Sequence, residues 1–157
     1  VMGIDGDFNM AYLKSQIGSG HKLYDLKNIF VSVKDEDKED IFEIVNSLNN
    51  SGYNIYTTRG THEFLTQKGI STNLVNKVAE GSPHVVEFIK EGKIDMIINT
   101  TENKQAIKDS FTIRRTAVDL NIPYFTNLRS AKILYKSLIS LKNNEISVKA
   151  IQNHHIY

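Results

Sequence analysis

The sequence predicts an α/β sandwich of three layers, in which a five-stranded, mostly parallel sheet carries helices on both faces. Two observations lead to this class. From Asn28 onward, short apolar runs bounded by polar residues or glycine recur along the chain, and segments of helical periodicity separate them. Strands that alternate with helices pair in parallel through right-handed crossovers. We therefore expect residues 23–157 to form one folded domain.

The expected elements follow one another in regular alternation. The strands are NIFVSV (28–33), YNIYTT (53–58), TNLVNKV (72–78), IDMIINT (94–100) and IPYFTN (122–127). The helices are DKEDIFEIVNSLNNSG (37–52), THEFLTQKG (61–69), SPHVVEFIKEG (82–92), DSFTIRRTAVDLN (109–121) and SAKILYKSLISL (130–141). A last apolar run, ISVKAI (146–151), is a candidate for an additional edge strand. His154 and His155 are expected in a frayed end.

Residues 1–22 differ from the rest of the chain. They contain one short amphipathic segment that a Gly18-Ser19-Gly20 breaker closes. We expect this stretch to be a linker or the tail of a preceding unit.

Composition narrows the class of function. The 157 residues are 40% hydrophobic and 24% charged, and no apolar run reaches the ~20 residues of a membrane span. The net charge of +1 comes from interspersed charges, so neither nucleic acid nor a membrane surface is an expected partner. No cysteine is present, and the five histidines lack metal-ligand spacing, so no metal site is expected. This composition fits a cytoplasmic protein.

Polar residues follow the expected strands, where open parallel sheets bind their ligands. Thr58 and Thr61 come after the second strand, with Gly60 between them to allow close approach. Lys77 ends the third strand, and Asn99 and Thr101 end the fourth. The ends of parallel strands meet at one edge of the sheet, so these side chains should converge.

Lys38 is expected at the same edge. It stands three residues before Ile41, on the apolar face of its helix that continues with Ile44, Val45 and Leu48. Singly, a threonine at a helix start is usually only a cap, and a lysine in a first turn is usually solvated. Two lysines with three hydroxyl groups and an amide indicate a site for a phosphate-bearing ligand. The sequence contains neither a Walker motif nor Gly-x-Gly-x-x-Gly, so nothing indicates triphosphate hydrolysis or a dinucleotide.

The same stretches carry a family resemblance. The motifs are DKEDIF, TTRGT, LVNKVAEGSPHV, IINTT and IRRTAVDLNIPYFT, in that order. From about Asn28 to Leu141 the chain resembles the carboxy-terminal regulatory domain of the carbamoyl phosphate synthetase large subunit, which has the methylglyoxal synthase-like fold. The opening residues are similar to the end of the preceding ATP-grasp unit of that enzyme.

The resemblance implies regulation by a nucleoside monophosphate, with UMP inhibiting and IMP able to activate, and no catalytic residue in this domain. Carried over by position, the effector-phosphate contacts are Lys38, Thr58, Thr61 and Lys77, with Asn99 and Thr101 beside them. A lysine at position 77 favours a nucleotide over N-acetylglutamate.

The remaining implications concern the parent enzyme. It makes carbamoyl phosphate from glutamine-derived ammonia and bicarbonate, for pyrimidine and arginine biosynthesis, using ATP, Mg and K that this domain does not bind. The implied partners are the preceding synthetase unit and a small glutaminase subunit. Thr126 matches an ornithine-side hydroxyl, whereas the neighbouring Phe125 departs from the polar residue that bacterial members often have.

The alternative is an enzyme, a methylglyoxal synthase acting on dihydroxyacetone phosphate. That chemistry requires a carboxylate base, in a loop that looks like Gly-Gly-Asp-Gln-Gln in those enzymes. Here the corresponding loop, residues 80–84, reads EGSPH, and Glu102 is the remaining candidate base. The cyclohydrolase part of the purine bifunctional enzyme is a more remote alternative, because the VNKV and EGSPH segments do not support it.

Overall fold

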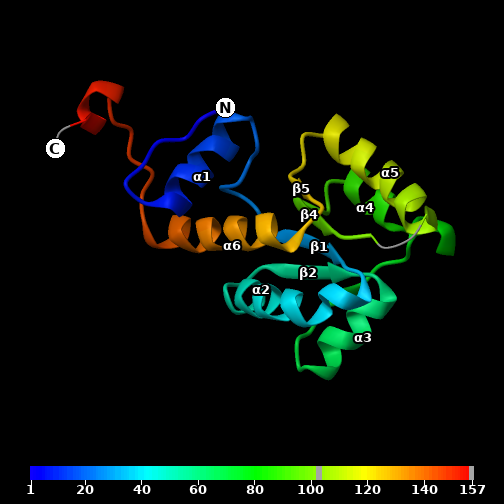
Figure 1. Ribbon diagram of the computed structural model, residues 1–157. Coiled ribbons are helices and arrows are strands. Elements are labelled where there is room, and N and C mark those ends of the chain that lie inside the picture. The colour runs from blue at the N-terminus through cyan, green and yellow to red at the C-terminus, as the bar shows by residue number, and fades with distance from the viewer. Residues whose placement is uncertain (102–103, 156–157) are drawn as a thin grey trace.

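The sheet has five strands, and all of them are parallel. A computed structural model describes residues 1–101 and 104–155 of the chain (Figure 1). The strands are β1 (Asn28–Ser32), β2 (Asn54–Thr57), β3 (Asn73–Leu74), β4 (Met96–Asn99) and β5 (Tyr124–Phe125), in the order β3-β2-β1-β4-β5. Pairing of Ser32 with Asn99 and of Val31 with Thr57 brings the carboxyl ends of the three central strands level. The predicted fold class is confirmed.

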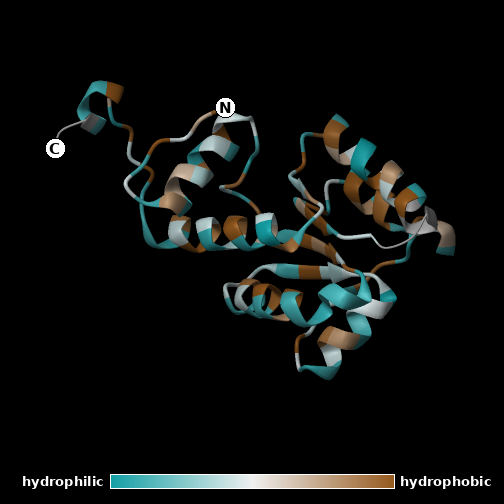
Figure 2. Cartoon of the chain, in the orientation of Figure 1, coloured by the Kyte–Doolittle hydropathy of each residue, from teal (hydrophilic) through white to brown (hydrophobic). Residues whose placement is uncertain are grey.

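Six α-helices accompany these strands in the described part of the chain. They are α1 (Phe8–Gly18), α2 (Lys38–Asn50), α3 (Arg59–Gln67), α4 (Val85–Lys90), α5 (Lys104–Asp119) and α6 (Leu128–Asn143). Short 3-10 helices span Asp35–Asp37, Val78–Glu80 and Ile151–His155. Hydrophobic and hydrophilic residues alternate along α2 and α6 (Figure 2), as expected for helices that cover one face of a sheet.

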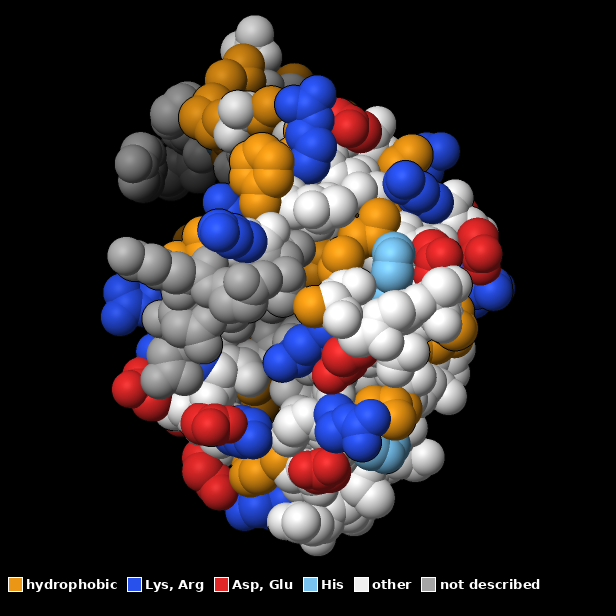
Figure 3. All heavy atoms as spheres, turned by 90° about the vertical axis from the view of Figure 1, so that its right-hand side faces the viewer, with side chains coloured by type: hydrophobic (Ala, Val, Ile, Leu, Met, Phe, Trp, Pro, Cys, Tyr) orange, Lys and Arg blue, Asp and Glu red, His pale blue; other side chains and the backbone are white. Residues whose placement is uncertain are grey.

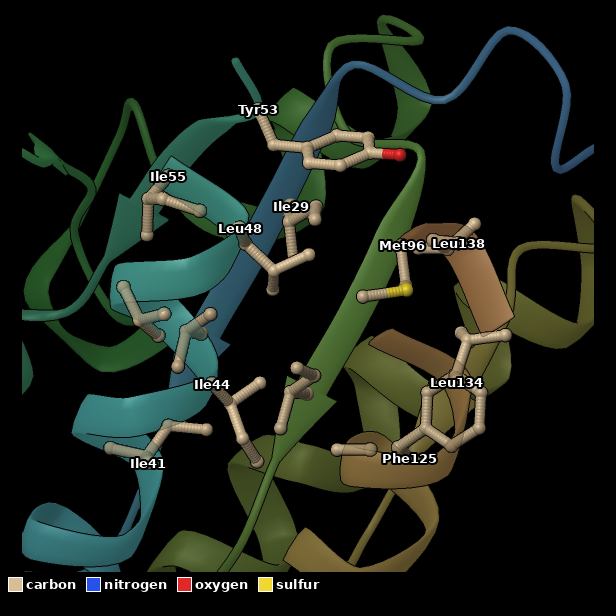
Figure 4. Close-up of a cluster of buried hydrophobic side chains, with 14 of the residues drawn as sticks. Ile29, Ile41, Ile44, Leu48, Tyr53, Ile55, Met96, Phe125, Leu134 and Leu138 are labelled. Carbon is tan, nitrogen blue, oxygen red and sulfur yellow. The ribbon is translucent and has the colours of Figure 1, made fainter. Parts of the chain in front are cut away.

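The sheet separates two hydrophobic cores. The large core lies on the face covered by α2 and α6, and Figure 4 shows part of it. Its members include Leu13, Ile29, Ile41, Ile44, Leu48, Tyr53, Ile55, Met96, Phe125, Leu134 and Leu138. The small core lies on the opposite face, under α4 and α5. It consists of Phe30, Val75, Val85, Val86, Ile89, Ile94, Ile97, Ile113 and Ala117.

Residues 1–22 include a helix that packs against the large core. Asp7 caps α1 by accepting a hydrogen bond from the Met10 backbone N–H at 3.0 Å. Met10 and Leu13 of α1 are buried in the large core, and α1 lies alongside α6 (Figure 1). Residues 1–22 therefore contain a helix whose apolar residues extend the large core of residues 23–157.

The expected edge strand at 146–151 is wrong. Residues 144–150 have no regular secondary structure, and the 3-10 helix follows them. Helix α6 carries the chain away from the sheet, so this run reaches no strand with which to pair. Ile146 packs against the large core, whereas Val148 stays in solvent, with 96% of its surface exposed.

Several boundaries also differ from those expected. The third strand is confined to two residues at the sheet edge, because the chain turns into a 3-10 helix at Val78. Helix α3 begins at Arg59 rather than Thr61, since Thr58 is its extended N-cap residue. Helix α4 begins after His84, and α6 begins after Asn127, whose side-chain oxygen accepts from the Ser130 N–H at 2.9 Å.

Candidate functional site

A cavity of about 350 Å³ opens at the carboxyl ends of the strands. All six residues chosen from the sequence line it: Lys38, Thr58, Thr61, Lys77, Asn99 and Thr101. They come from α2, from the turn into α3, from the segment after β3 and from the end of β4. The shared edge of the parallel sheet brings them together, as expected. That they bind phosphate stays a prediction.

The Lys38 ammonium lies over the start of α3. Its Nζ atom is 3.7 Å from the position that a Cβ atom on Gly60 would occupy, so the glycine leaves the ammonium close to the helix backbone. Lys38 also forms an ion pair with Asp35, with 2.7 Å between Nζ and Oδ1. The Lys38 ammonium lowers the pKa of Asp35 by hydrogen bonding and by its charge, and the charge of Lys77 adds to the effect.

Lys77 brings a second ammonium to the cavity. Its backbone N–H donates to the Glu80 carboxylate at 2.7 Å, which fixes the turn into the 3-10 helix. Among the described residues, no carboxylate forms an ion pair with the Lys77 side chain. Of these two ammonium groups, that of Lys38 is paired with an exposed carboxylate and that of Lys77 is available to an anion.

The threonines are buried and held by the protein. The Thr61 hydroxyl oxygen accepts from the Val33 N–H at 3.3 Å, which leaves its own O–H free to donate into the cavity. The Thr58 hydroxyl lies 2.9 Å from that of Ser32. In the helix ladder, His62 N–H bonds to the Thr58 carbonyl at 2.8 Å. The N–H groups of residues 59–61 precede that bond and lack intrahelical partners.

The end of β4 forms a neutral wall. Asn99 is buried, and its side-chain Nδ2 donates to the Tyr124 hydroxyl at 2.8 Å. The Thr100 hydroxyl accepts from the Lys34 N–H at 3.1 Å, and Thr101 is partly exposed at the cavity. This side of the cavity presents amide and hydroxyl groups without charge.

Apolar residues complete the lining. Phe30, Val78, Val85 and Ile113 face the cavity from the side of the small core, and Val33 comes from the large core. One part of the cavity is therefore cationic and another is hydrophobic. A ligand with an anionic group and a less polar body would match both.

Sequence reasoning missed several lining residues. The polar ones are Ser32, Lys34, Asp35 and Ser110 of α5. The rule that selects residues directly after a strand would have found Lys34 and Asp35, had it been applied to the first strand. Ser110 gave no such signal, because it lies inside a helix.

Other candidate residues lie elsewhere. Thr126 is exposed and does not line the cavity. Residues 80–84 also stay outside the lining, and the Glu80 carboxylate is occupied by the Lys77 N–H. His84 is the N-cap residue of α4. Glu102 falls outside the described residues.

The described surface offers no other strong signal of chemistry. In residues 1–101 and 104–155, no group of three or more acidic or histidine side chains could hold a metal ion. Over the same ranges, every helix is too short or too polar to cross a bilayer. On the face drawn in Figure 3, the described basic side chains are mixed with acidic ones rather than gathered in a basic patch.

Comparison with known proteins assigns the chain to a family. The chain belongs to the MGS-like domain family, whose model matches residues 40–126. It is 41% identical, over 98% of its length, to the carbamoyl phosphate synthase large chain of Myxococcus xanthus (strain DK1622). It is 38% identical, again over 98%, to the C-terminal section of the large chain of Aquifex aeolicus (strain VF5). The resemblance found in the motifs is confirmed.

The chain is much shorter than these relatives. It spans 14% of the Myxococcus protein and 29% of the Aquifex section. Among solved structures, it resembles the methylglyoxal synthase from Elizabethkingia anophelis NUHP1, with a TM-score of 0.55 and 18% sequence identity. That match covers 70% of this chain and 77% of the other, and it concerns the fold alone.

Proposed function

We propose that this chain is the effector-binding regulatory domain of a carbamoyl phosphate synthase. In this proposal its cavity binds a nucleoside monophosphate such as UMP or IMP. One observation carries the proposal: two ammonium groups and the amino end of α3 converge on one cavity, and part of that cavity is apolar. The family membership and the similarity to large-chain relatives support the same conclusion.

The phosphate would lie at the start of α3. Free backbone N–H groups at a helix amino end favour an anion, and the Thr61 hydroxyl, whose oxygen accepts from the Val33 N–H, could donate its own hydrogen to the phosphate. Lys38 and Lys77 would add charge-assisted hydrogen bonds. Binding would compete with the Lys38–Asp35 ion pair, which is exposed on the Asp35 side and therefore costs little to loosen.

The nucleoside would lie against the apolar wall. The cavity falls in the range of roughly 300 to 1,000 Å³ that small-molecule sites occupy. Phe30, Val85 and Ile113 could contact a base or ribose, while the β4 end supplies neutral hydrogen-bonding groups. Inorganic phosphate would fill only the cationic part.

In the parent enzyme the domain would control carbamoyl phosphate synthesis rather than perform it. ATP, Mg and K, the preceding synthetase unit and a small glutaminase subunit would belong to the rest of that assembly. Thr126 is exposed directly after β5 and before α6, and in this proposal it would contact a neighbouring unit and an ornithine site there. Thr126→Ala should preserve UMP affinity in this chain while altering the UMP response of the full synthase.

Calorimetric titration of this chain with UMP, IMP, ornithine, N-acetylglutamate and dihydroxyacetone phosphate tests the proposal. UMP or IMP should bind, and Lys77→Ala should weaken binding by about 1.5 to 3 kcal/mol without unfolding the chain. Lys90→Ala, at an exposed position of α4 outside the cavity, is the matched control and should bind as the wild type does. Unchanged UMP affinity in Lys77→Ala would show that the site is misplaced.

The enzymatic alternative has a direct test. Among the described lining residues Asp35 is the one carboxylate, and it is ion-paired with Lys38 rather than free to act as a base. We expect no methylglyoxal release when the chain is incubated with dihydroxyacetone phosphate. Release above the uncatalysed rate would establish the alternative.

A further inference from the structure

The Asn99 side chain is held in one orientation by a residue outside the cavity. Tyr124, at the start of β5, does not line the cavity, yet its hydroxyl accepts a hydrogen bond from Asn99 Nδ2 at 2.8 Å. We propose that Tyr124 is a positioning residue that commits the Asn99 carbonyl oxygen to the ligand. Asn99 would then recognise a hydrogen-bond donor on the nucleoside, not the phosphate. This inference rests on the proposed function.

The orientation of an asparagine amide decides what it can bind. Its NH₂ group only donates and its oxygen only accepts, so rotating the amide exchanges the two. In Asn99 one of the two N–H groups donates to Tyr124, which fixes the orientation of the amide, and no described residue donates to the carbonyl oxygen. Asn99 is only 6% exposed and lines the cavity. The carbonyl oxygen is thus an acceptor that has no partner among the described residues.

Tyr124 is well placed to hold this arrangement. Its backbone pairs with Ile97 of β4, two residues before Asn99. Its ring packs against the small core, and the Arg114 guanidinium lies over it at 5.5 Å from the ring centre. Because both the strand and the ring are fixed, the hydroxyl is fixed relative to Asn99.

As a consequence, two parts of the cavity would recognise two different parts of the ligand. Ionised phosphate oxygens accept hydrogen bonds and cannot pair with the Asn99 carbonyl. A ribose hydroxyl or a ring N–H can. The two ammonium groups at the start of α3 would recognise any phosphate, whereas the Asn99 carbonyl would distinguish a nucleoside monophosphate from inorganic phosphate.

Tyr124→Phe tests the inference, because it removes one oxygen and keeps the ring. We expect UMP affinity, measured by calorimetry on the whole chain, to fall about three- to tenfold. Affinity for inorganic phosphate should stay within about twofold. In an Asn99→Ala background the same substitution should have no further effect, since Tyr124 acts through Asn99. Tyr56→Phe, whose ring packs on Phe88 in the same small core, is the control.

A measurement without ligand separates this inference from the proposed function. In ¹⁵N-resolved spectra the Asn99 side-chain NH₂ should exchange slowly in the wild type and faster in Tyr124→Phe. Equal UMP affinity in wild type and Tyr124→Phe would overturn the inference and leave the proposed function intact. Equal losses for UMP and phosphate would place Asn99 at the phosphate, which also overturns it. If UMP fails to bind the wild type, the proposed function fails, and an unprotected Asn99 amide would refute the positioning role as well.

Discussion

The two faces of the sheet have different relations to the cavity. The large core, under α2 and α6, contributes only Val33 to the lining. The small core, under α4 and α5, contributes Phe30, Val85 and Ile113. One face therefore mainly stabilises the fold, while the other also shapes the ligand site. Substitutions on the two faces should separate stability from binding.

The largest expected effect is loss of stability on the large-core side. Leu48 is fully buried in α2, so Leu48→Ala should leave a void and lower the free energy of unfolding by about 2 to 5 kcal/mol. Urea denaturation measures this change. UMP affinity at a temperature where the variant is folded should equal that of the wild type. A large loss of affinity would show that the two faces are not separable.

The next substitution tests whether α1 unfolds together with the large core. Leu13 is fully buried against it, so Leu13→Ala should cost about 2 to 3 kcal/mol in the same cooperative transition. Phe8→Ala, at a 65% exposed position of the same helix, should change little. If Leu13→Ala left the main transition unchanged, residues 1–22 would behave as a tail, as the sequence suggested.

A smaller loss of stability with a change in binding is expected on the other face. Val85→Ala removes two methyl groups from the small core and should cost about 1 to 2 kcal/mol. Because Val85 also lines the cavity, UMP affinity should fall as the apolar wall recedes. Calorimetry beside urea denaturation gives both numbers. Wild-type affinity in this variant would contradict the proposed role of the small core.

The smallest effect is a pH dependence confined to the large core. Burial raises the pKa of Tyr53, so the folded state holds this proton more tightly than the unfolded state does. The associated stability is present below the ordinary tyrosine pKa of about 10 and is lost as pH rises above it. Tyr53→Phe should flatten the alkaline decline seen in thermal unfolding. Burial also raises the pKa of Tyr12, so the Tyr53→Phe variant should still lose some stability at alkaline pH. The charged group that faces the Tyr53 ring is the Lys142 ammonium, 4.3 Å from the ring centre. Identical alkaline profiles for the two proteins would contradict this assignment.

Local patterns predicted what depends on nearby residues. The apolar stripe Ile41, Ile44, Val45 and Leu48 identified α2, and all four are buried as expected. Strand ends identified five lining residues, since every strand of a parallel sheet ends at the same edge, and the stripe on α2 identified the sixth, Lys38. The periodicity could not show where the ISVKAI run would find a partner, because strand pairing depends on distant chain.

The missing parts of the site are also long-range. The hydrogen bond between Asn99 and Tyr124 requires β4 and β5 to pair in one register. The sequence of either strand alone does not predict that register. Asp35 is near Lys38 in sequence, but whether it would turn toward the ammonium or into solvent depends on the 3-10 turn between them. Such contacts can be identified only from the three-dimensional arrangement of the strands.

The packing of α1 against α6 has a mechanical consequence. These are the first and last α-helices of the described residues, so tension applied to the two ends of the chain loads their contact before it loads the sheet. A pull would separate α1 from α6 while the strand ends stay in register. In a longer polypeptide, the contact between α1 and α6 would yield first, so movements of the flanking segments would leave the cavity undistorted.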